Sequence, residues 1–240
     1  MEKLAVISDI HSNLEALTSV LNDISGQSIQ KIVSLGDNIG YGPDPEDVLL
    51  KLKSCLVTSI RGNHEFAILN DSYKRLFNLN AITALDINRK KLSDSSIQYI
   101  SSLDSSLALY GALFVHGISS NLIDGYIFNL SDAQLIKRAK KLHERIVFGG
   151  HTHLLRIYEV DNKGLKKKGF TQKISILDDK QYIINVGSVG QAKNGVHEAT
   201  YVIWDIQKST VEPRFVTYNY HHTAMKIKQA GLPQIYADIL

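Results

Sequence analysis

The sequence predicts an α/β protein in which two β-sheets pack together and helices lie outside them. Two observations lead to this fold class. The first half of the 240-residue chain alternates short apolar runs with segments of helical periodicity, and the second half is dominated by strand-like runs separated by turn residues. Strand–helix units followed by a series of hairpins favour two packed layers of sheet with helices on the outside.

The first half contains three predicted strands, each followed by a helix. Residues 4–7 form a short apolar run, as expected for a strand that is buried on both faces. Ser12 and Glu15 form a capping box, so we expect Ser12 to be the N-cap of the helix that follows. The other elements predicted in this half are strands at 32–35 and 56–60, a helix from Asp44, and helices across roughly 64–102.

The second half is richer in strands. Turn residues such as Asp161-Asn162-Lys163-Gly164 separate them, and we expect Lys166, Lys167 and Lys168 to lie on a solvated hairpin. One helix is predicted, from Ser131 to about Leu142. The predicted strands are two within 107–115, and one each at 146–148, 155–160, 174–177, 182–186, 201–206 and 214–218.

A single domain spanning 1–240 is predicted, with the segment from about residue 207 packing on it. An α/β fold often runs to about 250 residues as one unit. No internal repeat, low-complexity segment or Pro/Ser-rich linker divides this chain. The 44% hydrophobic and 21% charged residues are ordinary globular usage, which excludes a disordered chain, a collagen-like repeat and a coiled coil.

Several other classes of protein are excluded. Cys55 is the single cysteine, so no internal disulfide can form, and we expect it to be a small buried strand residue. The net charge of +3 is too small to predict specific nucleic-acid binding. The longest stretch without a charged residue, 105–123, is broken by Gly111, His116 and Gly117, so no membrane helix is expected. We expect a soluble, cytoplasmic protein with no membrane partner.

Residues with metal-binding side chains follow the predicted strands, at the point where each strand ends. The carboxyl ends of the strands of an α/β sheet meet at one edge, so we expect these side chains to converge. Asp9 and His11 are two residues apart, so an extended backbone would point both the same way, and His151 and His153 repeat that spacing. The full set is Asp9, His11, Asp37, Asn63, His64, His116, His151 and His153.

The donor types indicate which ions could bind. Mixed imidazole and carboxylate ligands suit Mn, Fe, Zn or Co rather than Ca or Mg alone, and manganese is our first expectation. Seven ligands are too many for one open ion. They suit two ions about 3.5–4 Å apart with a bridging carboxylate, as in phosphoester hydrolysis. Asp37 is the natural bridge, and His64 is then free to protonate a leaving alkoxide as a general acid.

No motif taken alone is decisive, but their order resembles that of a known family. The sequence resembles the calcineurin-like metallophosphoesterases from about residue 1 to residue 200. Segments 35–43 and 185–191 are also similar to loops of the small bacterial and archaeal members, which are described as phosphodiesterases or as diadenosine tetraphosphatase-like. The motifs that carry the resemblance are Asp9-x-His11, Gly36-Asp37, Gly62-Asn63-His64-Glu65, His116 and Gly150-His151-x-His153.

The resemblance implies a fold and a ligand set. The fold is a four-layer αββα sandwich of two mixed β-sheets flanked by helices, with a dinuclear site at the sheet edge. Hydroxide between the ions would attack phosphorus in line while His64 assists the leaving group. One ion would be held by Asp9, His11, Asp37 and His153, and the other by Asp37, Asn63, His116 and His151.

The sequence departs from the family pattern at three positions. The protein-phosphatase branch carries Asp and Arg shortly after its Gly-Asp motif, whereas this sequence has Gly40 and Tyr41. The usual carboxylate partner of the catalytic histidine and the usual phosphate-gripping arginine are therefore both missing. Glu65 replaces the usual Asp after that histidine, and we expect this change to have a small effect.

The predicted function is hydrolysis of a phosphodiester or a nucleotide pyrophosphate by a dinuclear-metal-dependent phosphoesterase. The substrate is expected to be a small phosphorylated molecule such as a nucleotide, with Asn38, Tyr41 and Ser188 as candidate pocket residues. Three alternatives stay open: a dinucleoside tetraphosphate hydrolase, a phosphomonoesterase, and a non-catalytic nucleotide-binding or scaffold protein of the same fold. Strand edges in the second half could pair two chains into a homodimer.

Overall fold

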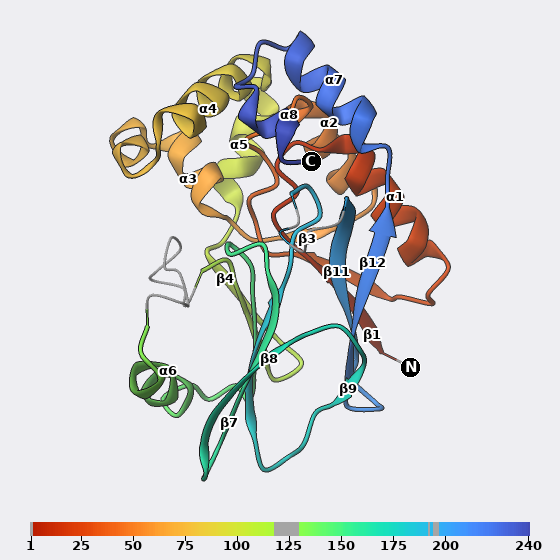
Figure 1. The fold of residues 1–240 in the computed structure, drawn as a ribbon, viewed down its shortest axis with the longest axis vertical. Helices are drawn as coiled ribbons and strands as arrows, with labels where there is room; N and C mark the ends of the chain where they lie inside the picture. Colours follow the sequence, from red (N-terminus) through yellow and green to blue (C-terminus); the bar gives the residue numbers. More distant parts are fainter. Residues whose placement is uncertain (1, 118–129, 192, 194–196) are drawn as a thin grey trace.

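Two mixed six-stranded sheets form the centre of the molecule (Figure 1). The computed structural model describes residues 2–117, 130–191, 193 and 197–240. The first sheet has the order β3 (Thr58–Ser59), β2 (Lys31–Ser34), β1 (Lys3–Ile7), β11 (Glu198–Asp205), β12 (Thr210–Thr217) and β9 (Ile174–Ser175). The second sheet has the order β4 (Ser106–Leu109), β5 (Ala112–Val115), β6 (Ile146–Gly149), β10 (Gln181–Val186), β7 (Leu155–Asp161) and β8 (Gly164–Gly169).

The apolar faces of the two sheets bury one another. Phe114 and Phe148 of the second sheet contact Trp204 of the first, with ring centroids 6.4 and 5.4 Å from the indole. In β1, Leu4 and Val6 belong to this central core, whereas the alternate residues face the helices outside the sheet. Strand β1 is therefore buried on both faces, as its unbroken apolar run predicted.

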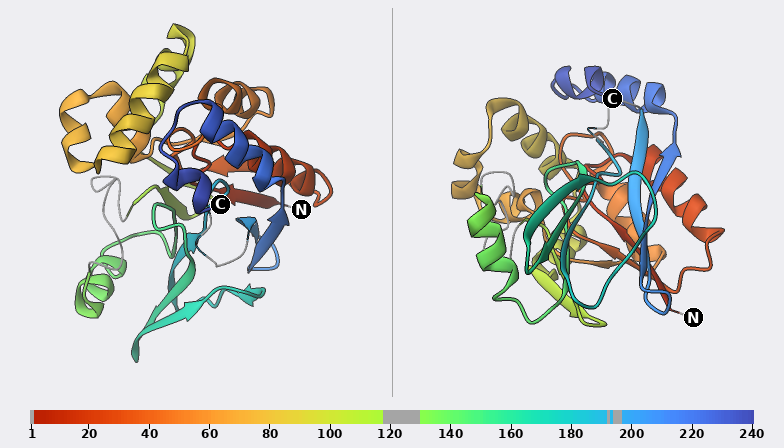
Figure 2. Two further views of the ribbon diagram at one scale, coloured as in Figure 1. Left: turned by 45° about the horizontal axis from the view of Figure 1, so that its top comes forward. Right: turned by 60° about the horizontal axis from the view of Figure 1, so that its bottom comes forward.

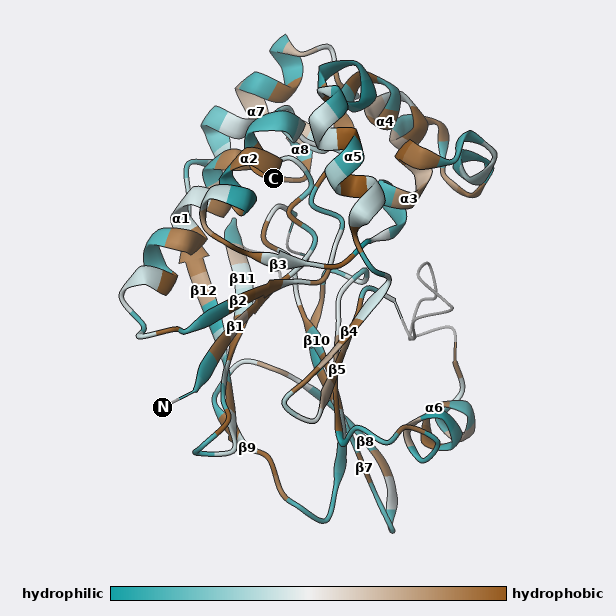
Figure 3. Ribbon diagram, turned by 180° about the vertical axis from the view of Figure 1, so that it is seen from behind, coloured by the Kyte–Doolittle hydropathy of each residue, from teal (hydrophilic) through white to brown (hydrophobic). Residues whose placement is uncertain are grey.

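Helices cover the outer face of each sheet. Leu17 and Val20 pack on the first sheet, and Leu135 packs on the second. Brown, the apolar end of the scale, recurs along the strands of both sheets in Figure 3. The arrangement is thus helix, sheet, sheet, helix, and the predicted α/β sandwich of two mixed sheets flanked by helices is confirmed. The helices are α1 (Leu14–Ser25), α2 (Pro45–Ser54), α3 (Asn63–Leu69), α4 (Leu79–Lys91), α5 (Asp94–Ser102), α6 (Asp132–Ala139), α7 (Tyr220–Gln229), α8 (Ile235–Asp238) and the 3₁₀ helix η1 (Asp71–Leu76).

Most of the helices other than α6 gather beyond one end of the sheets (Figure 1). There α7 packs on α1 and is followed by α8, and α7 lies beside the N-terminal helix in Figure 2. Lys226 of α7 donates a hydrogen bond to Glu15 at 2.8 Å, and Thr223 donates to Asn13 at 3.1 Å. The segment after 207 therefore packs on the first helix of the chain, while a single domain over 1–240 stays a prediction.

Two local expectations are wrong. Helix α1 begins one residue later than predicted, because Asn13 caps it by accepting a hydrogen bond from Ala16 at 3.1 Å. Ser12 has instead a positive φ of 54° and donates to Asn88. Cys55 is exposed at the end of α2 rather than buried in a strand, because the third strand is shorter than predicted and begins at Thr58.

Two further expectations concern the surface. Lys166, Lys167 and Lys168 are exposed in β8 of the β7–β8 hairpin, which confirms the solvated hairpin. Within the part of the chain that the structure describes, no helix has the length and apolar character needed to cross a membrane.

Candidate metal centre and active site

The loops at the carboxyl ends of β1, β2, β5 and β6 and the start of α3 converge beneath the helical end of the molecule (Figure 1). All eight side chains predicted for the site lie there, and each is buried, with at most 7% of its surface exposed. Parallel pairing of β1 with β2 and of β5 with β6 aligns these ends. The order of strands in the chain thus gathers residues that lie up to 144 positions apart (9 to 153).

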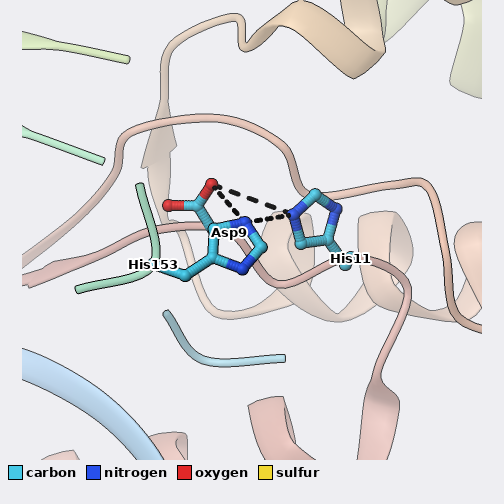
Figure 4. Close-up of side chains that lie close together, drawn as sticks. All are labelled: Asp9, His11 and His153. Atoms are coloured by element: carbon cyan, nitrogen blue, oxygen red, sulfur yellow. Dashed lines mark hydrogen bonds and ion pairs between the residues drawn. The ribbon is translucent and has the colours of Figure 1, made fainter. Parts of the chain in front are cut away.

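One group of donors contains Asp9, His11 and His153 (Figure 4). The Nε2 atoms of the two histidines are 3.0 Å apart. Oδ1 of Asp9 is 3.4 Å from Nε2 of His153 and 3.8 Å from Nε2 of His11. Two ligands at about 2.1 Å from one ion lie about 3.0–3.4 Å apart for angles between 90° and tetrahedral. The spacing therefore fits a single divalent ion with only small adjustment.

A second group contains Asp37, His116 and His151, with Asn63 beside it. Nε2 of His116 is 3.2 Å from Oδ2 of Asp37, 3.2 Å from Nδ1 of His151 and 2.8 Å from Oδ1 of Asn63. Oδ2 of Asp37 is also 4.0 Å from Nε2 of His11, which belongs to the first group. Asp37 thus lies between the two groups.

Backbone carbonyls orient three of the histidines. Nδ1 of His11, His116 and His153 lies 3.2, 3.0 and 2.9 Å from the carbonyl oxygens of Ile39, Leu35 and Gln191, in that order. Because a carbonyl can only accept a hydrogen bond, Nδ1 carries the proton and the Nε2 lone pair faces the cluster. Such outer partners fix the tautomer and the orientation of metal-ligating histidines.

The site loops differ from the extended backbone expected for the Asp9/His11 and His151/His153 pairs. Five of the predicted ligands have a left-handed backbone, a conformation that costs an ordinary residue about 1–3 kcal/mol. Backbone hydrogen bonds hold the loops in place, for example His11 N–H to the Asp37 carbonyl at 2.9 Å. The φ angles are 54° at Asp9, 48° at His11, 51° at Asp37, 66° at His151 and 61° at His153.

Glu65 organises the Asp37 loop, a role that sequence reasoning missed. Its carboxylate accepts hydrogen bonds from the N–H groups of Asp37, Asn38 and Gly62 at 2.9, 2.7 and 2.8 Å. Burial and the nearby Asp37 raise the pKa of Glu65 to about 7, while these donors favour its charged form. The only sequence signal for this role is an acidic residue three positions after Gly62, at the start of a helix.

Asn88, in the middle of α4, joins two site loops. Its Oδ1 accepts from Ser12 Oγ and from Gly40 N–H, both at 2.8 Å, and its Nδ2 donates to the Gly42 carbonyl at 3.0 Å. The side chain is fully buried. No feature of the sequence marks Asn88 beyond its being a polar residue inside a helix, and the long range of its contacts explains why it was missed.

The charges of the cluster favour a bound cation. Burial would raise the pKa values of Asp9 and Asp37, but His153 beside the first and His116 beside the second hold both well below the usual range. Burial would lower the pKa of His116, but Asp37 raises it to about 9. The carboxylates thus stay ionised and attract positive charge, which a divalent ion can supply in place of a proton.

His64 is held differently from the other histidines. Its Nε2 lies 3.8 Å from Oδ2 of Asp37, and burial lowers the pKa of its imidazole. Its Nδ1 is buried and has no hydrogen-bond partner among the described residues. The rings of Tyr41 and Phe77 pack against it edge to face, at centroid distances of 4.6 and 5.0 Å.

A pocket of about 200 Å³ opens onto this cluster. Asp37, Asn63, His64, His151 and His153 line its inner side, and Tyr41, Tyr73, Phe77 and Lys193 are among the residues of the remaining wall. Of the three predicted substrate residues, Tyr41 lines this pocket. Asn38 and Ser188 are fully buried: Asn38 accepts from Ser34 Oγ, and Ser188 donates to the Asp9 carbonyl.

The family follows from comparison with known proteins. Residues 2–209 match the calcineurin-like phosphoesterase superfamily domain, and the chain belongs to that family. An uncharacterized protein of Methanocaldococcus jannaschii is 32% identical over 96% of this chain and 94% of its own length. The chain is accordingly a metallophosphoesterase whose clustered His and Asp side chains suit a divalent metal, and this class of hydrolase acts on phosphorylated substrates.

Two other proteins are similar to this chain. The crystal structure of a metallophosphoesterase from Sphaerobacter thermophilus has a TM-score of 0.81 at 27% identity, over 99% of this chain and 97% of that one. Serine/threonine-protein phosphatase 2 of Escherichia coli is 43% identical over 61 residues, which are 25% of this chain and 28% of that protein. The first similarity covers the whole fold and the second only a local segment.

Proposed function

We propose that the chain is a dinuclear phosphoesterase, with manganese as the expected metal, that cleaves a phosphodiester or a nucleotide pyrophosphate. The position of Asp37 between the two donor groups carries this proposal. One ion would be held by Asp9, His11, Asp37 and His153, and the other by Asp37, Asn63, His116 and His151. Iron, zinc and cobalt are the alternatives that the same donors accept.

The protein residues have separable tasks in this reaction. When bound, the two ions supply Lewis acidity toward the phosphate and lower the pKa of water. Asp37 holds the two donor groups in register, and the carbonyl-bound histidines keep their lone pairs directed inward. Attack on phosphorus is in line, so the leaving oxygen departs on the side opposite the incoming water.

His64 is proposed to protonate that leaving oxygen. It lines the pocket beside Asp37 and Asn63, and its Nε2 lies at the edge of the cluster, close to donor atoms of His11 and Asp37. Burial lowers its pKa, and an anionic phosphate beside it would favour the charged form that a general acid requires. Proton donation of this kind contributes about 10²–10⁴-fold to a rate.

The residues of the pocket wall suit a small substrate that carries one ring. Tyr73 and Phe77 offer aromatic surface, and Lys193 offers one positive charge at the rim. Tyr41 stands where the protein-phosphatase branch has an arginine. The missing positive charge favours a phosphodiester, which carries one negative charge, over a phosphomonoester, which carries two. These features suit a nucleotide diester, and a dinucleoside tetraphosphate hydrolase is the narrower form of the same proposal.

A phosphomonoesterase is the second candidate. The local 43% identity to a serine/threonine-protein phosphatase supports it. A non-catalytic nucleotide-binding or scaffold protein is less well supported, because all seven proposed ligands are present and close together. A homodimer and a cytoplasmic location stay predictions.

The test is hydrolysis of bis-p-nitrophenyl phosphate beside p-nitrophenyl phosphate, with metal-stripped protein and with added Mn²⁺. We expect diester cleavage that is lost on stripping and returns with the metal. Faster cleavage of the monoester would favour the phosphomonoesterase. No cleavage of either, with two ions shown to be bound and dinucleotides also uncleaved, would favour the non-catalytic protein.

A further inference from the structure

The last two helices lie beyond the part of the chain that matches the family. The match ends at residue 209, whereas α7 and α8 occupy 220–238 and lie at the active-site end of the molecule (Figures 1 and 2). Tyr236 of α8 is buried and stacks on Tyr41, with ring centroids 4.4 Å apart and an interplanar angle of 23°. A residue outside the family domain thus touches a residue of the pocket wall.

Tyr41 also contacts two histidines of the site. Its ring lies 4.3 Å from the ring of His11 and 4.6 Å from the ring of His64, which it meets edge to face. His11 is also oriented by a carbonyl hydrogen bond, but Nδ1 of His64 has no such partner among the described residues. The orientation of the His64 ring therefore depends on packing against three rings, those of Tyr41, His11 and Phe77, and Tyr41 is the nearest of them.

The backbone before Tyr41 explains why no side chain at position 40 can orient His64. Gly40 has a φ of 104°, and a Cβ added to it would lie 2.1 Å from Nδ1 of His64. The imidazole thus occupies the space that any side chain at this position would need. A side chain at position 40 therefore has no room, and the ring contacts with Tyr41, His11 and Phe77 surround the imidazole instead.

We propose that Tyr236 is a positioning residue: by stacking on Tyr41 it fixes the ring against which His64 is held. This inference rests on the proposed function, because it concerns the histidine proposed to be the proton donor. Helix α8 is itself held firmly. Lys226 of α7 bonds to Glu15 and to Asp44, and Leu232 packs with Tyr236 and Ala84 of α4 in one apolar cluster.

The test uses two diesters that differ in leaving group. Bis-p-nitrophenyl phosphate has a good leaving group that needs little protonation, and diphenyl phosphate has a poor one. Tyr236→Leu removes the stacked ring and keeps an apolar side chain. We expect kcat for diphenyl phosphate to fall by about tenfold, a part of the 10²–10⁴ that a general acid contributes, with kcat for the nitrophenyl diester and both KM values nearly unchanged.

Two further variants separate positioning from folding. Tyr236→Phe keeps the ring and should restore both rates, whereas a hydroxyl-dependent role would leave it as impaired as Tyr236→Leu. Ile235→Ala alters an exposed residue of the same helix and should change neither rate. Equal losses for the two diesters in Tyr236→Leu, or no loss for either, would overturn the proposal.

A second measurement does not depend on activity. The ¹H–¹³C signals of the His64 ring should be shifted by the neighbouring rings of Tyr41 and Phe77, and should move and broaden in Tyr236→Leu but not in Ile235→Ala. Unchanged His64 signals in Tyr236→Leu would overturn the positioning role even if the wild-type protein cleaved neither diester. In contrast, failure of the wild-type protein to cleave any phosphoester would contradict the proposed function alone.

Discussion

Three of the histidines proposed as metal ligands and His64 lie in one cluster but are held by different forces. His11, His116 and His153 each have a carbonyl oxygen within 3.2 Å of Nδ1, so hydrogen bonds fix both their tautomer and their direction. Among the described residues, Nδ1 of His64 has no hydrogen-bond partner, and its ring packs against those of Tyr41, His11 and Phe77. The comparison indicates that the orientation of these three proposed ligands should resist local change, whereas the position of the proposed proton donor depends on packing.

The largest effect is expected from Asp37→Asn, which removes the carboxylate shared by the two donor groups. Metal-dependent hydrolysis should fall by roughly 10³-fold or more, because each ion supplies several kcal/mol of charge stabilisation. The metal content should fall with it. Asp178→Asn, at an exposed carboxylate beside Arg145, is the matched control and should leave both unchanged. Near-normal hydrolysis by Asp37→Asn would be inconsistent with a shared ligand.

His64→Ala should remove the proposed proton donor while leaving the proposed metal ligands in place. The metal content should be retained, and kcat for diphenyl phosphate should fall by about 10²–10⁴-fold, the usual contribution of a general acid. The loss for bis-p-nitrophenyl phosphate should be much smaller. His143→Ala removes an exposed histidine and serves as the control. If both diesters slow equally, His64 is not the proton donor.

Gly40→Ala tests whether packing alone holds His64. The new methyl group would occupy the place of Nδ1, so we expect the leaving-group dependence of His64→Ala in weaker form, about tenfold to a hundredfold. Gly111→Ala is the control, because Gly111 also has a positive φ, of 75°, but has no neighbour within 4 Å of the added Cβ. Both variants should lose about 1 kcal/mol or more of folding stability from backbone strain. If Gly40→Ala acted only through backbone strain, its activity would equal that of Gly111→Ala.

Glu65→Gln should weaken metal binding indirectly, without removing a proposed ligand. The amide can accept fewer of the N–H donors of the Asp37 loop, and its own NH₂ would face one of them. Loss of a partner that orients a ligand loop lowers metal affinity by about 10–100-fold, which Mn²⁺ titration would measure. Glu46→Gln removes a carboxylate that binds Ser93 away from the site and should leave the affinity unchanged. An unchanged affinity in Glu65→Gln would show that the loop holds its shape without it.

Much of the fold was predictable because its signals are local. The apolar run at 4–7 identified a doubly buried strand, and turn residues identified the β7–β8 hairpin. The convergence of the eight site residues followed from their places at strand ends. The errors at Ser12 and Cys55 are shifts of a few residues at element boundaries, where a side-chain partner from elsewhere, such as Asn88, decides the conformation.

The support of the site could not be predicted in the same way. The supporting contacts join residues at very different separations in the chain. Glu65 binds Gly62, three positions away, whereas Tyr236 stacks on Tyr41, 195 positions away. Asn88 likewise bonds to two distant loops. Nor does the spacing of Asp9 and His11 show that both adopt a left-handed backbone. These features depend on which loops meet in space, and that information appears only once the sheets are assembled.

The most direct test of the account is the number of Mn²⁺ ions bound per chain in the wild-type protein and in Asp37→Asn, measured by calorimetric titration of metal-stripped protein. Two ions in the wild-type protein, with both weakened in the variant, is the predicted result, because Asp37 would belong to both sites. One ion at saturation in the wild-type protein, or two ions of unchanged affinity in Asp37→Asn, would contradict it.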